Sequence, residues 1–183
     1  MDDERRARVF AALKKSVGLT AERLEAAPLA KLLAVTRLGG MHPESRADRL
    51  KDIAALATEH GGGGLEAVLA LPLPAARKIL RAFPSIGAPG ADKILLACGS
   101  SSALALESNG LRVLVRLGRG REDKSYAATY RSVISDVAGE LGPDADRAWR
   151  AHRLLRAHGQ QVCRNRAPEC DACALAEVCP SAS

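Results

Sequence analysis

Apolar residues in this chain of 183 residues recur at the three- and four-residue spacing of amphipathic helices almost throughout. Strict alternation of apolar and polar residues is absent, and only residues 111–115 could also form a strand. Prolines and glycines separate the helical segments by connections of one to eight residues, as in packed helical hairpins. The pattern predicts an all-α protein with helices at 3–16, 21–26, 28–38, 43–60, 65–71, 74–82, 88–98, 107–117, 125–141 and 144–158.

The composition is that of a globular protein from inside a cell. Apolar residues make up 47% and charged residues 26%, and the length allows a core without disulfides. Aromatic residues, at 3%, are too few for an RNA-binding sheet on which bases stack. No apolar run approaches the roughly 18 residues of a membrane span, and the N-terminus has no hydrophobic signal region. We therefore expect a monomeric cytoplasmic protein that has no membrane partner.

The positive charge of the chain is unevenly distributed. The formal net charge is +6, and residues 107–166 carry 12 basic and 7 acidic side chains. The residues from 167 onward contain three acids and no base. A basic second half favours a polyanionic partner such as nucleic acid. Four glycines at 61–64 end one predicted helix and predict a flexible joint.

Four of the five cysteines crowd the C-terminal end with the spacing C-x6-C-x2-C-x5-C: Cys163, Cys170, Cys173 and Cys179. In an intracellular protein this pattern indicates metal ligation rather than disulfides. Four thiolates suit either zinc or an iron–sulfur cluster. Zinc sites usually contain two C-x2-C pairs, so a single pair favours the cluster over a zinc staple. The fifth cysteine, Cys98, follows Leu95 and Leu96 in a predicted helix, and we expect it to be buried.

The cysteine spacing resembles the 4Fe-4S loop of the endonuclease III family of DNA glycosylases, in the HhH-GPD superfamily. The resemblance implies that the four cysteines ligate a 4Fe-4S cluster within a loop at 163–179. Arg164, Asn165 and Arg166 lie between the first two cysteines. In the family this basic loop contacts DNA phosphates, so the resemblance implies that Arg164 and Arg166 bind DNA.

A second segment, Phe83-Pro84-Ser85-Ile86-Gly87, resembles the L-P-G-V-G turn of the superfamily's helix-hairpin-helix. Backbone N–H groups at the N-terminus of a helix can bind a phosphate without reading sequence. Ser85 stands where the family has its first glycine. The resemblance implies that the hairpin, at about 83–90, and the helix after it contact DNA through Ser85, Ile86, Gly87, Gly90 and Lys93. An ordinary turn between two core helices is the alternative.

A third segment, from Glu107 to Gly118, resembles V-D-T-H-x-x-R-V-x-x-R-L-G, in which the aspartate is catalytic. The resemblance implies that Glu107 is the catalytic carboxylate, with one more methylene than the family's residue. It also implies a substrate pocket and further DNA contacts. The pocket residues would be Pro89, Ser108 and Asn109, and the DNA contacts Arg112 and Arg116. Alternatively, Glu107 is an acid favoured at a helix start by the helix dipole.

Bifunctional members of the family carry a nucleophilic lysine in the pattern L-P-G-V-G-x-K. Pro89 stands at that position, 18 residues before Glu107. A proline cannot form a Schiff base, so we expect no AP-lyase activity. Lys93 lies one turn later and suits a phosphate contact better than a relocated nucleophile.

The resemblance implies a two-lobed helical HhH-GPD fold. Residues 19–117 would form a central lobe with the hairpin, and residues 1–18 plus 118–183 a second lobe with the cluster loop. We predict a nucleoid-associated prokaryotic base-excision-repair glycosylase. It would flip a damaged or mispaired base out of double-stranded DNA and hydrolyse its N-glycosidic bond. A noncatalytic binder of DNA lesions or structures, and a zinc-stapled interaction module, are the alternatives.

Overall fold

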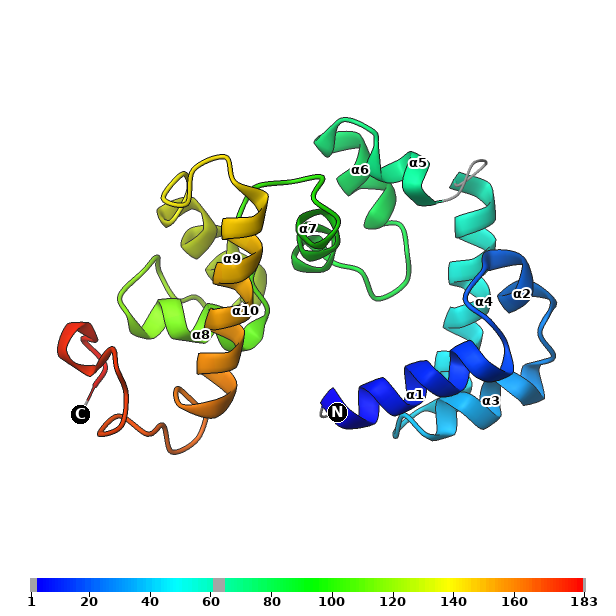
Figure 1. Ribbon diagram of the computed structural model, residues 1–183, viewed down its shortest axis with the longest axis horizontal. Helices are drawn as coiled ribbons and strands as arrows, with labels where there is room; N and C mark the ends of the chain where they lie inside the picture. Colours follow the sequence, from blue (N-terminus) through cyan, green and yellow to red (C-terminus); the bar gives the residue numbers. More distant parts are fainter. Residues whose placement is uncertain (1–2, 61–64, 183) are drawn as a thin grey trace. The chain divides into compact units, whose positions relative to one another are not determined.

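The computed structural model describes residues 3–60 and 65–182 (Figure 1). The predicted glycine joint at 61–64 lies outside the described residues. Every regular element in the described part of the chain is a helix, so the all-α prediction is confirmed. The chain divides into two compact units, Met1–Ser85 and Ile86–Ser183. The predicted lobes, 19–117 and 1–18 with 118–183, have other boundaries than these two units and remain a prediction.

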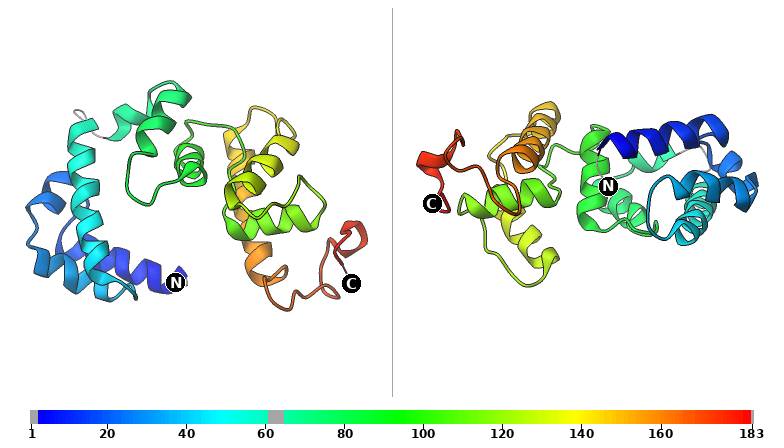
Figure 2. Two further views of the ribbon diagram at one scale, coloured as in Figure 1. Left: turned by 180° about the vertical axis from the view of Figure 1, so that it is seen from behind. Right: turned by 90° about the horizontal axis from the view of Figure 1, so that it is seen from below.

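The first unit is organised around one long helix, α4 (Figure 2). Helices α2 and α3 pack against α4, and α1 packs against α3. The apolar core between them contains Leu24, Leu32, Ala47 and Ala54. The helices of this unit are α1 (Asp3–Ser16), α2 (Ala21–Ala26), α3 (Leu29–Arg37), α4 (Pro43–His60), α5 (Leu65–Leu69) and α6 (Leu73–Leu80).

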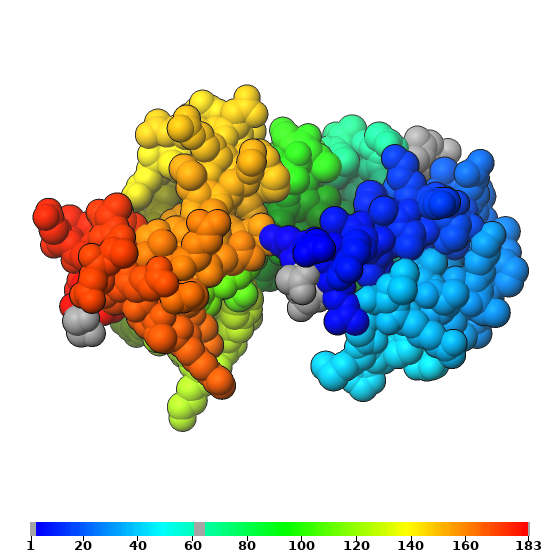
Figure 3. Space-filling model, turned by 60° about the horizontal axis from the view of Figure 1, so that its bottom comes forward, coloured from blue at the N-terminus to red at the C-terminus, as the bar shows by residue number. Residues whose placement is uncertain are grey.

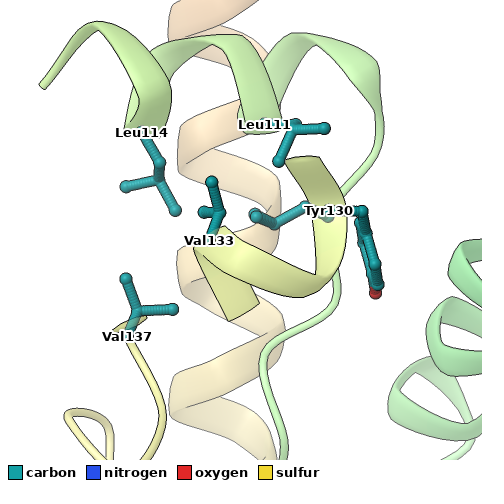
Figure 4. Packing of buried hydrophobic residues seen from close by; sticks show 6 residues of the cluster. Leu111, Leu114, Tyr130, Val133 and Val137 are labelled. Carbon is teal, nitrogen blue, oxygen red and sulfur yellow. The ribbon is translucent and has the colours of Figure 1, made fainter. Parts of the chain in front are cut away.

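The second unit is built on two helices that cross in its core, α8 and α10. Helix α9 covers another side of α8, where Leu111 and Leu114 face Tyr130 and Val133 (Figure 4). The α-helices of this unit are α7 (Ala88–Ala97), α8 (Ser108–Arg116), α9 (Tyr126–Asp136) and α10 (Ala145–Gln161). A short 3-10 helix, Ala176–Val178, lies in the cysteine-rich segment.

Helix boundaries differ from the predicted ones at a few places. Residues 111–115 are helical, which settles the one helix–strand ambiguity. Helix α9 ends at Asp136 rather than at residue 141, with Val137 as its C-cap, and Gly139 at φ +81° then turns the chain. Helix α10 continues to Gln161, three residues beyond the prediction.

The expected burial of Cys98 is wrong. Cys98 is the C-cap of α7 and is exposed, because the helix ends there and Gly99 at φ +73° redirects the chain. Among the described residues no helix combines the length and the apolar character needed to cross a membrane.

Candidate functional site

The carboxylate of Glu107 is fixed at the N-terminus of α8. Glu107 is the N-cap residue, with extended backbone angles, and its Oε1 accepts the backbone N–H of Gly110 at 2.8 Å. The side-chain amide of Asn109 donates to Oε2 at 2.8 Å. The carboxylate is half-buried, and each oxygen has further lone pairs that can accept hydrogen bonds. Helix capping therefore orients this acid without saturating it.

A continuous set of hydrogen bonds joins Glu107 to the cysteine-rich segment. Arg112 Nη2 donates to Asn109 Oδ1 at 2.9 Å, and so fixes which end of the Asn109 amide faces Glu107. The same guanidinium donates through Nε to the carbonyl of Cys163 at 3.0 Å, and through Nη2 to the carbonyl of Gly159 at 2.6 Å. The guanidinium of Arg112 thus donates to oxygen atoms of the protein itself. The sequence instead predicted that it contacts a DNA phosphate.

The close approach of α10 to α8 depends on a glycine at the contact. A Cβ added to Gly159 would lie 2.5 Å from the carbonyl oxygen of Asn109. No side chain fits there, so only glycine lets α10 reach the first turn of α8. On the α8 side, Gly110 is buried, and an added Cβ would meet Leu155 at 3.4 Å. This packing keeps the end of α10 beside Glu107 and Asn109.

Two tyrosines of α9 connect α8 with α7. The Tyr130 hydroxyl donates to Asp92 Oδ2 of α7 at 3.0 Å, and the Tyr130 ring stacks on Tyr126 with centroids 6.4 Å apart. Burial raises the pKa of Tyr126, and the negative charge of Glu107 adds to the rise. Burial, followed by the charge and the hydrogen bond of Asp92, raises the pKa of Tyr130. Both phenols are therefore neutral near pH 7, and Tyr126 lies within the electrostatic field of Glu107.

Helix α7 begins at Ala88, where the sequence predicts the start of a helix. Gly87 is its N-cap, and Pro89 stands in its first turn, where the missing N–H is tolerated. Lys93 lies four residues later on the same helix face, and both residues are half-buried. Ser85, at the position of the family's first glycine, has the φ of +66° that a glycine would readily adopt.

The four C-terminal cysteines share one cavity in the second unit. All four are half-buried and line it together with Arg116 and His158. Figure 3 shows this C-terminal segment, in red, against the orange end of α10. Within residues 3–60 and 65–182, however, no group of three or more His, Cys, Asp or Glu side chains is arranged to hold a metal ion.

Hydrogen bonds from the chain reach two of the four sulfur atoms. Arg116 Nη1 donates to Cys163 Sγ at 3.3 Å, and the backbone N–H of Leu175 donates to Cys173 Sγ at 3.4 Å. Hydrogen bonds to ligand sulfurs and limited solvent exposure are the features by which proteins tune iron–sulfur clusters. His158 Nε2 lies 3.6 Å from Cys173 Sγ, within hydrogen-bonding distance of the same sulfur.

The predicted DNA-binding arginines fall into two groups. Arg116 donates to the carbonyls of Arg164 at 2.8 Å and Asn165 at 3.4 Å, so it supports the loop from inside. Arg164 and Arg166 are exposed, and Arg164 forms an ion pair with Glu169 at 2.5 Å. Of the two exposed arginines in the described part of the loop, only Arg166 therefore presents its charge outward without an ion pair.

Sequence reasoning missed three members of this site: Asp92, Tyr126 and Tyr130. The available signal was the pair of tyrosines one helical turn apart, in a chain with only five aromatic residues. Ser108 and Asn109, predicted to line a pocket, both lie on the first turn of α8, with Ser108 exposed.

No model of a known protein family matches the chain. Endonuclease III of Sulfolobus acidocaldarius is 27% identical over 171 residues, which are 93% of this chain and 71% of that protein. The structure of endonuclease III in a non-covalent complex with DNA aligns with a TM-score of 0.77 at 20% identity, covering 99% of this chain and 77% of the other. A thermostable thymine-DNA glycosylase gives 0.74 at 16% identity, covering 97% and 76%. The chain is endonuclease III-like in sequence and shares the helical fold of both enzymes.

Proposed function

We propose that this chain is a base-excision-repair DNA glycosylase. It extrudes a damaged or mispaired base from double-stranded DNA and hydrolyses the N-glycosidic bond of that base. The observation that carries the proposal is the half-buried Glu107 carboxylate, held by two N–H donors in an endonuclease III-like chain. Because the proposed substrate is DNA, the proposed location is the cytoplasm of a prokaryotic cell, in association with the nucleoid.

Glu107 supplies the negative charge at the reaction centre. Cleavage of an N-glycosidic bond develops an oxocarbenium-like positive charge on the sugar, which a fixed carboxylate stabilises. The bonds from Gly110 and Asn109 orient the acid in advance, so little reorganisation accompanies the reaction. The remaining lone pairs of the carboxylate can orient the attacking water. Pro89, Ser108 and Asn109 are the proposed pocket residues.

Phosphate contacts come from the hairpin turn, the start of α7 and the loop before Cys170. The backbone N–H groups near the N-terminus of α7 carry a partial positive charge that favours a phosphate oxygen. The proposed contacts are Ser85, Ile86, Gly87, Gly90, Lys93, Arg164 and Arg166. The guanidinium groups of Arg112 and Arg116 bond to the chain's own carbonyls, so holding the loop fits their geometry better than a phosphate contact.

The proposed enzyme is monofunctional, with water as the nucleophile. Pro89 has no amine at the position of the family's nucleophilic lysine, and this supports a product strand that contains an intact abasic site. The lysine of α7, Lys93, is the residue whose involvement would contradict this part of the proposal.

A panel of duplexes, each with one damaged or mispaired base, tests the proposal. Base release with strand breaks only after alkali is the expected result, and borohydride should trap no protein–DNA adduct. A Glu107→Gln variant serves as the control for contaminating glycosylases. Absence of release from every duplex would contradict the glycosylase assignment. A trapped adduct that disappears in Lys93→Ala would contradict the monofunctional assignment.

A noncatalytic binder of DNA lesions is the second candidate. The observation that favours it is the engagement of both Glu107 oxygens in hydrogen bonds with the first turn of α8, which is a structural role. Tight, lesion-dependent binding by a protein that releases no base from the same duplexes would favour this candidate over the enzyme.

The proposed cofactor is a 4Fe-4S cluster held by Cys163, Cys170, Cys173 and Cys179. Bound there, the cluster would cross-link the loop and keep its basic residues in place. Iron and acid-labile sulfide should copurify with the protein under anaerobic conditions, and Cys170→Ser should lower both. One zinc per chain without sulfide would contradict the cluster and favour a zinc staple.

A further inference from the structure

Arg49 of α4 reaches across to the hairpin turn in the first unit. Its Nη1 donates to Ser85 Oγ at 3.2 Å, although 36 residues separate the two in sequence. Both residues are exposed. Arg49 lies outside the three segments whose sequences resemble motifs of the endonuclease III family.

The contact is made to a residue whose backbone conformation is strained. Ser85 has φ +66°, a left-handed conformation that residues with a Cβ adopt infrequently. The hydrogen bond from Arg49 to the hydroxyl of Ser85 favours this conformation of the turn. A guanidinium has five N–H donors, and this bond occupies one of them. The others can bind an anion that approaches the turn.

A second arginine lies beside the first. Arg46 is one helical turn before Arg49, and both line a cavity of about 290 Å³ together with Pro84 and Ser85. The other lining residues are apolar or hydroxyl-bearing, and none is acidic. The positive field of the two guanidiniums at this turn is therefore not neutralised from within the cavity.

We propose that Arg49 is a DNA-binding residue, which positions Ser85 and binds a backbone phosphate of the DNA at this turn. Arg46 adds positive charge at the same place. The ligand is a phosphodiester of duplex DNA, recognised without regard to sequence. The inference rests on the proposed binding of DNA by the hairpin, but not on excision of a base.

The salt dependence of binding to an undamaged duplex tests the inference with the full-length chain. Arg49→Ala should reduce the slope of log K against log salt by about one unit, the value for one lost phosphate contact. Arg49→Lys keeps the charge and should keep most of the slope. Arg8→Ala removes an exposed arginine of α1 and is the matched control, with an unchanged slope expected.

A second background separates phosphate binding from support of the turn. Glycine at position 85 needs no support, so Arg49→Ala should lower the slope equally in a Ser85→Gly protein. An unchanged slope in Arg49→Ala, or an effect that disappears in the Ser85→Gly background, would overturn the inference. Excision is measured in parallel. If the unsubstituted protein excises a base but Arg49→Ala leaves the slope unchanged, only the role of Arg49 is contradicted. If Arg49→Ala lowers the slope but the unsubstituted protein excises no base, only the proposed enzyme is contradicted.

Discussion

The guanidinium of Arg112 donates to the backbone carbonyl of Cys163 at 3.0 Å, so α8 holds the first cysteine of the loop directly. The same group donates to Asn109, whose amide donates to Glu107. One side chain therefore positions both the candidate catalytic acid and the start of the proposed cluster loop.

Arg112→Lys should disturb both ends of this set of bonds. Lysine keeps the charge but not the planar fork, so at least one of the three acceptors loses its donor. We expect the free energy of unfolding to fall by about 2 kcal/mol. We also expect slower excision and faster release of iron. Denaturant titration measures the stability, single-turnover kinetics the excision, and visible absorbance the release of iron. Arg131→Lys, on the exposed side of α9, is the control. If iron release and excision both match the wild type, Arg112 does not couple the two.

The sequence was sufficient for the helices and for the proximity of the cysteines, because local periodicity and short spacing determine both. The positions of Arg112 and Arg116, one helical turn apart, indicate that they share a helix face. They do not indicate what lies opposite that face. The loop after Cys163 comes from a segment about 50 residues away, and only tertiary packing brings its carbonyls to the two arginines.

The hairpin illustrates the same limit. A Pro/Gly-containing turn was evident in the sequence, but the left-handed conformation of Ser85 and its bond to Arg49 were not. Propensity alone would place glycine, not serine, at that position. The partner that compensates lies on α4 and has no signature in the sequence. Tyr126 was missed for a related reason, since its importance comes from its position near Glu107.

Ser85→Gly should stabilise the protein, although it deletes a hydrogen bond. Removing the Cβ from a residue at φ +66° relieves about 1–2 kcal/mol of strain. The greater freedom of glycine in the unfolded chain offsets about 0.4–1 kcal/mol of this gain. The lost bond to Arg49 is exposed and contributes less. Urea denaturation measures the difference. Ser135→Gly, near the end of α9, is the matched control, because the same change within a helix should destabilise by about half a kcal/mol. Destabilisation in both variants would show that Ser85 is not strained.

The stability of the protein should fall at alkaline pH because of Tyr130. Tyr130 is 4% exposed, and burial and Asp92 raise the pKa of its phenol above the ordinary value of about 10. Above pH 10 the unfolded chain releases this proton while the folded chain retains it. The stabilising effect of the neutral phenol is therefore complete below about pH 10 and is lost as the pH rises further.

Tyr130→Phe should make the free energy of unfolding less dependent on pH between about 10 and 11. Urea titrations at a series of pH values from 8 upward would measure this. Tyr126→Phe is the control, because Tyr126 is 46% exposed and a smaller change is expected from its removal. If both substitutions reduced the pH dependence of the free energy of unfolding equally, burial of Tyr130 would not be the cause of the loss of stability at alkaline pH.

Substitutions at Glu107 separate its role in capping from its role in excision. Glutamine retains an oxygen that can accept the N–H of Gly110, so Glu107→Gln should fold normally and bind DNA. It lacks the charge that stabilises an oxocarbenium-like transition state, so excision should fall by about 100-fold or more.

Aspartate also caps helices well, and Glu107→Asp should remain active if the pocket accommodates the shorter acid. Glu107→Ala removes both functions and should in addition destabilise the protein by about 1 kcal/mol. Single-turnover excision and urea denaturation of the three variants provide the comparison. Wild-type excision by Glu107→Gln would leave Glu107 with helix capping alone.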